Sequence, residues 1–259
     1  MVEVKKTAFY DKHVDFGGKM VEFAGYMMPI QYSSITEEHM AVRESAGVFD
    51  VSHMGEFIVN GDNALDFLDF MTINNVKKLK VGQVQYSAMC YPDGGIVDDL
   101  LVYHYPLHYM VVVNAANIDK DFQHIQDYVK GNTGIYDETD NYSLLALQGP
   151  KSKDILQKLT KTDLAAMNFY WFSEGEAAGK KATISRTGYT GELGYEIYHR
   201  PEDGAAIWDA LFEAGTPLGL KPVGLGARDS LRLEMKYALY GNDISRHTNP
   251  LEAGLGWVT

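Results

Sequence analysis

The sequence is poor in cysteine and contains no long hydrophobic run. Its 259 residues include one cysteine, Cys90, which excludes a disulfide framework and a cysteine-rich metal site. No stretch approaches the roughly 18 consecutive apolar residues that a membrane-spanning helix requires. The first residues, Met1–Ala8, lack the apolar core of a signal peptide. These features predict a soluble, cytoplasmic protein with no membrane partner.

Basic residues are also in the minority. Lys and Arg number 23 against 35 Asp and Glu, which gives a formal net charge of −12. A nucleic-acid partner is therefore not expected, because phosphate binding requires concentrated positive charge. No metal site is expected either, since Pro106 interrupts the only helical spacing of histidines, at His104 and His108. The segment after Gly224 lacks the third glycine of a dinucleotide fingerprint, which argues against a nicotinamide cofactor.

What is present is an ordinary globular composition, with 46% hydrophobic and 22% charged residues. A chain of this length forms one large domain or two smaller ones. Cys90 lies within the apolar run Tyr86–Tyr91, which favours a buried, inert thiol over a nucleophile.

The N-terminal part of the chain predicts a helix followed by strand structure. Ser34 and Glu37 have the spacing of a capping box, so a helix is expected to begin there and to end at Gly47. The β-branched and aromatic residues of Val48–Val59 then favour strands.

The next segment predicts a small α+β unit of about ninety residues, near the lower size limit of a domain. Asp62 is expected to cap a short amphipathic helix, and Pro92–Gly95 has the composition of a hairpin turn. The expected helices and strands are Ala64–Met71, Tyr86–Tyr91, Ile96–Tyr105, Tyr109–Ala115 and Ile118–Val129.

A second group of elements follows Tyr142. Gly149 and Pro150 are expected to open a helix that runs through Leu159. The other expected strands and helices are Tyr142–Leu147, Lys181–Arg186, Tyr195–His199, Glu202–Ala214 and Ala227–Tyr237.

One segment, Ser185–Glu196, combines glycines with tyrosine and glutamate. Its glycines allow sharp turns and close approach of a ligand, and a buried glutamate accepts paired N–H donors. Together these residues suit a flat heteroaromatic ligand rich in N–H groups. The same glycine spacing is typical of an ordinary hairpin loop, and the pattern alone favours that simpler interpretation.

Two adjacent carboxylates, Asp98 and Asp99, lie on a predicted strand. Successive side chains of a strand point to opposite faces, so only one of the two can face a given pocket. The pattern does not choose between them, and a lone strand aspartate is more often a turn or edge residue.

Five segments in this order resemble one family, the tetrahydrofolate-dependent aminomethyltransferases known as the T-protein of the glycine cleavage system. The resemblance runs from about Thr7 to the last residue. The segments are Gly17–Gly25, Phe49–Glu56, Gly94–Leu100, Ser185–Glu196 and Gly224–Glu234.

The resemblance implies a fold and a domain arrangement. The implied class is α+β, a folate-binding aminomethyltransferase fold of two interleaved α+β domains with mixed or antiparallel sheets. Residues 1–52 and 142–250 form a discontinuous folate-binding domain, and residues 53–141 form an inserted domain. The family's C-terminal β-barrel is expected to be absent, with residues 251–259 as the start of the connection to it, which puts the activity of the chain by itself in question.

The resemblance also implies a reaction. The methylene of an aminomethyl group on the lipoylated H-protein moves to tetrahydrofolate, a co-substrate, and ammonia is released. The second aspartate of the Gly-Gly-x-x-Asp-Asp-Leu motif is the family's catalytic residue, which is Asp99 here. Positioning together with electrostatic stabilisation is the favoured role for Asp99, and acid–base transfer of a proton is the alternative.

Further residues are assigned to the folate site by the resemblance alone. Glu196 is expected to accept N–H donors of the pterin, and Arg228 to reach the pterin or its linker. An exposed strand glutamate and an ion pair of Arg228 with Asp229 or Glu234 are the simpler interpretations. Phe169 stands where relatives carry tyrosine. The remaining cavity residues implied are Met54, Tyr86, Asn114, Tyr189 and Tyr237.

Other functions remain as alternatives. The same scaffold occurs in folate-dependent demethylases that act on methylated sulfur or amine compounds, and this is the second choice. A folate-binding scaffold for iron–sulfur maturation is less favoured, because Cys90 lacks the Lys-Gly-Cys-Tyr context of such relatives. A folded fragment without activity is the third alternative.

Overall fold

The chain forms two compact units in the computed structural model, which describes residues 4–259. The first unit contains the chain up to His53 and Asp140–Tyr237, and the second contains Met54–Thr139 and Ala238–Thr259. The second unit is thus inserted into the first and also takes up the C-terminal residues. The first three residues of the expected N-terminal segment lie outside the described residues.

A six-stranded mixed sheet forms the centre of the first unit. Its strand order is β11-β12-β13-β10-β4-β14, and every neighbouring pair is antiparallel except β4 and β14. The strands are β4 (Ala46–Asp50), β10 (Ser143–Gln148), β11 (Phe172–Ala177), β12 (Lys180–Ser185), β13 (Gly194–His199) and β14 (Leu220–Pro222).

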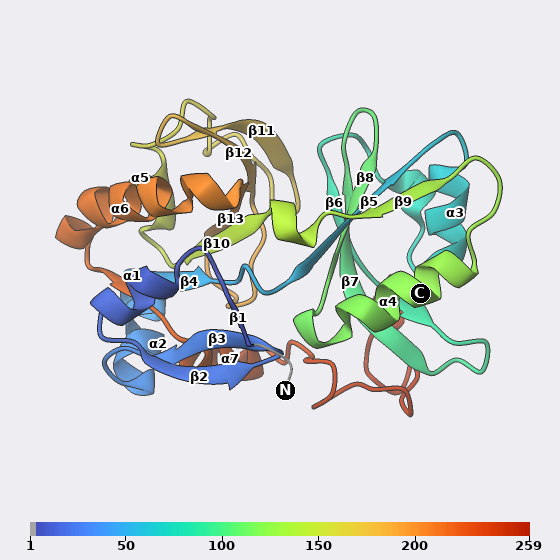
Figure 1. Ribbon diagram of the computed structural model, residues 1–259, viewed down its shortest axis with the longest axis horizontal. Coiled ribbons are helices and arrows are strands. Elements are labelled where there is room, and N and C mark those ends of the chain that lie inside the picture. Colours follow the sequence, from blue (N-terminus) through green and yellow to red (C-terminus); the bar gives the residue numbers. More distant parts are fainter. Residues whose placement is uncertain (1–3) are drawn as a thin grey trace. The chain divides into compact units, whose positions relative to one another are not determined.

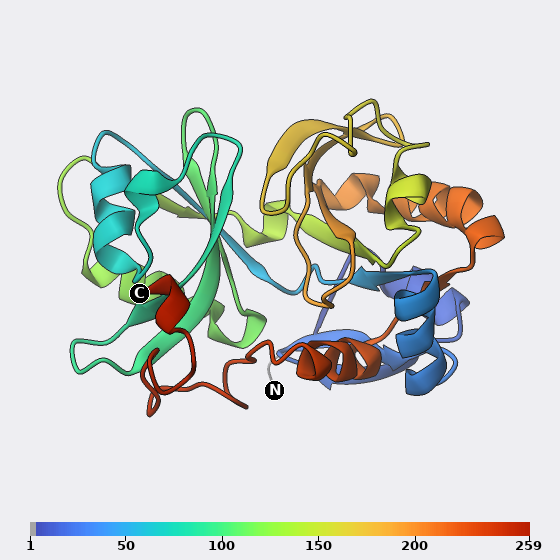
Figure 2. The same cartoon turned by 180° about the vertical axis from the view of Figure 1, so that it is seen from behind.

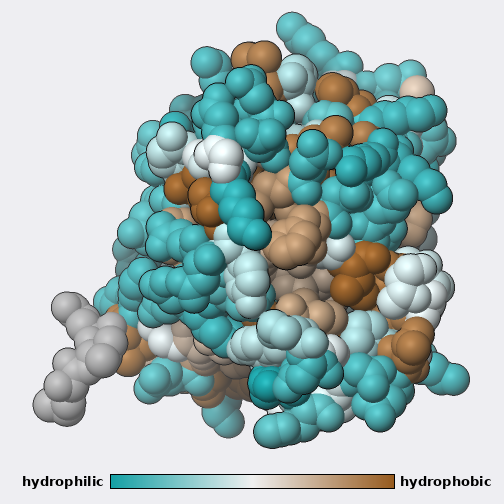
Figure 3. Space-filling model, turned by 90° about the vertical axis from the view of Figure 1, so that its right-hand side faces the viewer, coloured by the Kyte–Doolittle hydropathy of each residue, from teal (hydrophilic) through white to brown (hydrophobic). Residues whose placement is uncertain are grey.

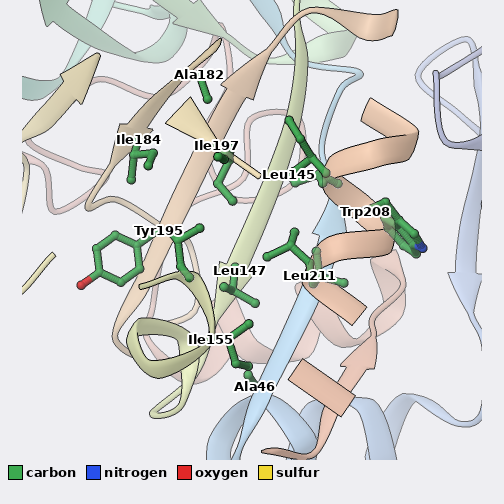
Figure 4. Close-up of a cluster of buried hydrophobic side chains, with 14 of the residues drawn as sticks. Ala46, Leu145, Leu147, Ile155, Ala182, Ile184, Tyr195, Ile197, Trp208 and Leu211 are labelled. Carbon is green, nitrogen blue, oxygen red and sulfur yellow. The ribbon is translucent and has the colours of Figure 1, made fainter. Parts of the chain in front are cut away.

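Two helices cover this sheet and complete its core. Helices α5 (Ser152–Leu156) and α6 (Gly204–Gly215) lie together beside the sheet (Figure 1). Figure 4 shows Leu145 and Leu147 of β10 directed toward the buried side chains of α6. Trp208 is fully buried there and packs against Phe212 with ring centroids 5.0 Å apart. Burial of these apolar side chains is the main stabilising contribution of the sheet–helix interface.

A smaller sheet, in the order β1-β3-β2, lies beside α2 and α7 in the same unit. Its strand pairs are parallel between β1 and β3 and antiparallel between β2 and β3. The elements are β1 (Lys5–Lys6), α1 (Tyr10–Asp15), β2 (Lys19–Phe23), β3 (Tyr26–Gln31), α2 (Ile35–Glu44) and α7 (Leu225–Glu234).

A buried polar network joins the N-terminal elements to β4. His13 Nε2 lies 2.9 Å from Asp50 Oδ2, and the Thr7 hydroxyl donates to the same oxygen at 2.6 Å. The Tyr32 hydroxyl bonds to the other ring nitrogen of His13 at 2.8 Å. Burial acts to raise the pKa of Asp50, but hydrogen bonds and charge from His13, with Thr7 and Ser52, hold that pKa below its ordinary value.

The second unit is built on a five-stranded antiparallel sheet in the order β6-β7-β8-β5-β9. Side chains of α3 and α4 complete its apolar core, among them Phe67, Leu68 and Ile125. The elements are β5 (Gly55–Asn60), α3 (Ala64–Met71), β6 (Val84–Cys90), β7 (Ile96–His104), β8 (Tyr109–Val113), α4 (Ile118–Asp127) and β9 (Gly134–Asp137).

The C-terminal residues pack against this second sheet. Ile244, Leu255 and Val258 are buried in one cluster with Ala88 of β6 and Ile96 of β7. Figure 2 shows this segment, in dark red, beside the sheet. Residues 238–250, which the sequence assigned to the folate-binding domain, therefore group with the inserted unit by contact.

The structure confirms most predicted elements and corrects several of their ends. Gly47 does not stop the first helix; α2 ends at Glu44, and Gly47 lies in β4. Asp62 does not cap α3, because its carboxylate accepts a hydrogen bond from Asn132 instead. The helix expected through Leu159 ends at Leu156. Strands β1, β2, β3, β9, β11 and β14 and the short helix α1 were not predicted.

The predicted cap of α2 is present, and it provides a test of the local structure. Ser34 Oγ accepts a hydrogen bond from the Glu37 amide at 3.2 Å. We expect Ser34→Ala to lower the free energy of unfolding by about 1 kcal/mol, because an amide of the first turn loses its partner. Chemical denaturation measures the change, with the exposed neighbour Thr36→Ala as the control. Equal stabilities of the two variants would refute the role of the cap.

Among residues 4–259, no helix is long and apolar enough to cross a membrane. The face seen in the space-filling view is mostly hydrophilic and carries separate apolar patches (Figure 3).

Candidate functional site

The carboxylate of Asp99 is held from two sides within the second unit. Its Oδ2 accepts a hydrogen bond from the Tyr86 hydroxyl of β6 at 3.0 Å, and its Oδ1 accepts one from Asn114 Nδ2 at 2.8 Å. Asn114 follows the end of β8, so three neighbouring parts of the sheet position this one carboxyl group. Three of the residues expected in the site, Asp99, Tyr86 and Asn114, are therefore in direct contact.

The neighbouring Asp98 is fully buried and accepts hydrogen bonds from three N–H groups. Its Oδ2 accepts from the Asn114 backbone at 3.0 Å, and its Oδ1 accepts from the side-chain amides of Asn114 at 2.9 Å and Asn117 at 2.7 Å. Asp99, in contrast, is partly exposed. Of the two adjacent aspartates, Asp99 is thus the one with access to a reactant.

Asp99 has the titration behaviour of an acid–base group. Burial and the negative charge of Asp98 raise the pKa of Asp99 to about 7, and the hydrogen bonds from Tyr86 and Asn114 oppose that rise. At neutral pH the carboxyl group is therefore able both to hold and to release a proton.

An exposed aromatic residue lies over Tyr86. The rings of Tyr86 and Trp257 stack with centroids 5.7 Å apart and an angle of 12° between their planes. Trp257 is nevertheless 70% exposed, which is unusual for so large an apolar side chain in a folded protein. The sequence interpretation did not include Trp257 among the site residues.

In the first unit, Glu196 occupies a buried position on β13. It is 8% exposed, and its Oε2 accepts a hydrogen bond from the Thr187 hydroxyl. Burial raises the pKa of Glu196, while Thr187 and the positive charge of Arg228 oppose the rise. The simpler interpretation, an exposed strand glutamate, does not hold for this residue.

Arg228 lies over an aromatic pair. Its guanidinium carbon is 4.7 Å from the centroid of the Tyr189 ring, and Tyr189 stacks on Tyr237 with centroids 5.8 Å apart. Burial lowers the pKa of Arg228, an effect that Tyr189 and Glu196 oppose. The guanidinium of Arg228 is thus close enough to Glu196 to affect its pKa. Tyr189, Tyr237 and Glu196, which were assigned to the same site, form one group with Arg228.

The ion pairs suggested as a simpler role for Arg228 are formed by other residues. Asp229 pairs with Arg232 at 2.7 Å, and Glu234 pairs with Arg43 at 2.7 Å. Within the described part of the chain, the Arg228 guanidinium has no carboxylate within ion-pair distance. Arg228 is half-buried, and its guanidinium N–H groups are suited to a polar ligand.

The glycines of the Ser185–Glu196 segment have a packing explanation. A Cβ atom on Gly188 or Gly194 would lie 2.1–2.3 Å from side-chain atoms of Gln148. Gln148 in turn donates to the Thr187 carbonyl at 3.2 Å and accepts from the Thr190 hydroxyl at 3.0 Å. These glycines therefore admit Gln148, which braces the loop that carries Tyr189.

The remaining residues considered from the sequence are more scattered. Met54 is half-buried in the bend before β5, and Phe169 is 62% exposed and contacts the Tyr170 ring edge-on. His53 is buried, its ring meets Phe23 edge-on at 5.4 Å, and its Nδ1 has no partner among residues 4–259. Burial, with the charge of Arg228, lowers the pKa of His53 to about 4, so this ring is neutral at physiological pH. Cys90 is partly buried, and burial raises its pKa.

Several residues of these networks were missed by the sequence interpretation. Asn117 follows Asn114 by three positions, a spacing that would have indicated paired amides at one site. Thr187 and Trp257 gave no such signal, because a lone threonine or tryptophan has many common structural roles. In residues 4–259, no group of three or more histidine, cysteine or acidic side chains is arranged to hold a metal ion.

Comparison with known proteins gives one consistent result. A family model described as the GCVT N-terminal domain matches residues 9–259. Aminomethyltransferases from Halothermothrix orenii and Phocaeicola vulgatus are each 55% identical to the chain, over 98% and 99% of its length and 72% of theirs.

Solved structures agree. The glycine cleavage system aminomethyltransferase T from Bartonella henselae superimposes with a TM-score of 0.91 at 34% identity, covering 98% of this chain and 69% of that one. A chain of the heterotetrameric sarcosine oxidase from Corynebacterium sp. U-96 has a TM-score of 0.53 at 17% identity over 73% of this chain and 94% of its own, a likeness of fold alone. The chain therefore belongs to the GCVT N-terminal domain family, that of the glycine cleavage aminomethyltransferases.

Proposed function

We propose that Asp99 is the catalytic carboxylate of this chain and that Glu196 and Arg228 bind the folate. The chain is a tetrahydrofolate-dependent aminomethyltransferase, which moves a methylene from the aminomethyl-lipoyl H-protein to tetrahydrofolate with release of ammonia. The observation that carries the assignment of Asp99 is its partly exposed carboxyl group, held through both oxygens and with a pKa of about 7.

The residues of the first unit fit a pterin. Glu196 presents a buried carboxylate that among the described residues is bonded only by Thr187, so it has acceptor capacity left for ring N–H groups. Arg228 offers guanidinium donors without a competing carboxylate, and the Tyr189 and Tyr237 rings give flat apolar surface. We propose that the first unit is the folate-binding domain; the assignment of Met54, which belongs to the second unit, to the folate site stays a prediction from the family resemblance.

We propose that the chain promotes the reaction through the negative charge of Asp99 and through the fixed position of its carboxyl group. When bound, tetrahydrofolate supplies the two nitrogens that accept the carbon. Asp99 then acts in two ways: its negative charge stabilises positive charge that develops on the carbon, and its carboxyl oxygens hold a proton that leaves a nitrogen. Tyr86 and Asn114 fix the direction of these oxygens, which lowers the cost of ordering the reactants.

Two finer proposals concern the setting of the reaction. We propose the lipoylated H-protein as the macromolecular partner, on the basis of the family, with no nucleic acid and no membrane. We also propose a cytoplasmic location, in keeping with a sequence that has one cysteine.

A donor assay tests the function. The 259-residue chain is incubated with tetrahydrofolate and aminomethylated H-protein, and ammonia and 5,10-methylenetetrahydrofolate are measured. We expect both products in equal amounts, and none with H-protein that lacks the lipoyl group. Parallel reactions contain a methylated sulfur or amine compound in place of the H-protein. A folate product from those donors, and none from the H-protein, would overturn the assignment.

A further inference from the structure

The amide of Asn114 bridges two carboxylates. Its Nδ2 lies 2.9 Å from Asp98 Oδ1 and 2.8 Å from Asp99 Oδ1, and this nitrogen carries two hydrogens. The backbone carbonyl of Asp99 is a third acceptor at 3.2 Å, so the two hydrogens serve Asp98 on one side and Asp99 on the other. The amide cannot turn without breaking both bonds, so Asp98 fixes the orientation of the group that holds Asp99.

We propose that Asp98 is a positioning residue for Asp99, which it orients through the Asn114 amide. The proposal deepens the function proposed for Asp99 and rests on it. Asp98 has no route to a reactant of its own, because it is fully buried.

Asp98 lies among backbone and side-chain N–H groups. Three N–H groups donate to it, from the Asn114 backbone, the Asn114 side chain and the Asn117 side chain. A fixed negative charge in this position makes ionisation of Asp99 harder, which is the effect of a like charge in a low dielectric.

The charged and titratable groups around the pair come from three further elements. Lys120 and Asp121 face Asp98 from α4, Tyr240 faces it from the segment after α7, and Tyr86 faces Asp99 from β6. Lys120 Nζ lies 3.6 Å from Asp121 Oδ1 and donates to the Val97 carbonyl. It also lies 4.2 Å from the centroid of the Tyr240 ring.

Asp121 differs from Asp98 although both are fully buried. Neither of its carboxyl oxygens has a hydrogen-bond partner among residues 4–259. Burial and the nearby Asp98 carboxylate raise the pKa of Asp121 to about 10, an effect that Lys120 only partly opposes. Asp121 is therefore neutral at pH 7, and Asp98 and Asp121 can be separated by experiment.

Direct titration of Asp99 tests the proposal without an activity assay. Difference infrared spectroscopy of the 259-residue chain follows the carboxyl band that Asp99→Asn removes. In Asp98→Asn we expect the midpoint of this titration to fall by about one unit or more, because the adjacent negative charge is gone. In Asn114→Ala we expect the midpoint to rise, because a hydrogen bond that favours the ionised carboxylate is lost.

Asp121→Asn is the matched control. It replaces a neutral acid by a neutral amide of the same shape, so we expect the Asp99 midpoint to stay at the wild-type value. An Asp98→Asn protein that titrates at or above the wild-type midpoint overturns the proposal. If thermal unfolding shows that Asp98→Asn is not folded, the titration of Asn114→Ala is used in its place. An Asp99 midpoint in Asn114→Ala equal to the wild-type midpoint then overturns the proposal.

The result of the infrared titration does not depend on the role assigned to Asp99 in the reaction. Asp99→Asn with wild-type turnover would refute that role, whereas the titration would still report on Asp98. If both proposals hold, the pH dependence of kcat shifts in Asp98→Asn in the same direction as the infrared midpoint. In the Asp99→Asn background, Asp98→Asn then produces no further shift.

Discussion

Asp99→Asn is expected to lower kcat by about 10²–10³-fold while the Kd for tetrahydrofolate changes by less than about threefold. Asparagine keeps the size of the side chain and its contacts with Tyr86 and Asn114, but it has no negative charge and no site for the departing proton. The loss therefore falls on an interaction made in the transition state. Steady-state kinetics and calorimetric titration of the folate measure the two quantities.

Asp93→Asn is the control for this substitution. Asp93 lies in the turn between the same two strands, β6 and β7, and forms an exposed ion pair with Arg246 at 2.5 Å. We expect its removal to leave kcat within about twofold of the wild type, because exposed pairs contribute little. Near wild-type turnover in Asp99→Asn would show that another group carries the reaction.

Glu196→Ala is expected to weaken tetrahydrofolate binding by about 10- to 100-fold. The buried carboxylate would otherwise accept charge-assisted hydrogen bonds from the pterin. Its removal also takes away a negative charge that favours the charged form of the half-buried Arg228. Calorimetric titration of the folate measures the change. Glu196→Gln, which keeps the Thr187 contact, is expected to weaken binding less than Glu196→Ala.

Glu176→Ala is the matched control, because Glu176 is an exposed glutamate on β11 of the same sheet. Folate affinity in that variant should equal the wild-type value. If Glu196→Ala also binds tetrahydrofolate with wild-type affinity, the assignment of the pterin site to the first unit is wrong. Loss of affinity in both variants would instead indicate general damage to the sheet.

The sequence predicts well those helices and strands whose ends are set by nearby residues, such as turn residues or a helix cap. The hairpin of β6 and β7 follows from the turn residues Pro92–Gly95 between two apolar alternating runs, and α2 follows from the Ser34 cap. The hairpin of β2 and β3 has no such signal. Its turn contains Ala24 with φ of 48°, and Pro29 within β3 removes a backbone donor, so both residues argue locally against strands.

The candidate site was predictable only in part for a similar reason. Family resemblance pointed to Asp99, but the bond from Asn114 depends on β7 and β8 lying side by side, which no local spacing reveals. The role of Asp98 depends on burial, and burial is a property of the folded sheet. The glycine pattern alone favoured an ordinary hairpin loop, and the structure adds that Gly188 and Gly194 make room for Gln148, a contact that no local spacing reveals.

The insertion of one unit into the other has a consequence for the order of folding. All five strands of the second sheet lie between Gly55 and Asp137, and two of its four pairings, β6 with β7 and β7 with β8, join strands that follow one another in the sequence. The six-stranded sheet instead pairs β4 with β10 across the entire inserted segment, and its edge strand β14 comes later still. Contacts between distant segments form slowly because their loops must close first. During synthesis, then, all strands of the inserted sheet have been made before either partner of β4, β10 or β14, has been synthesised.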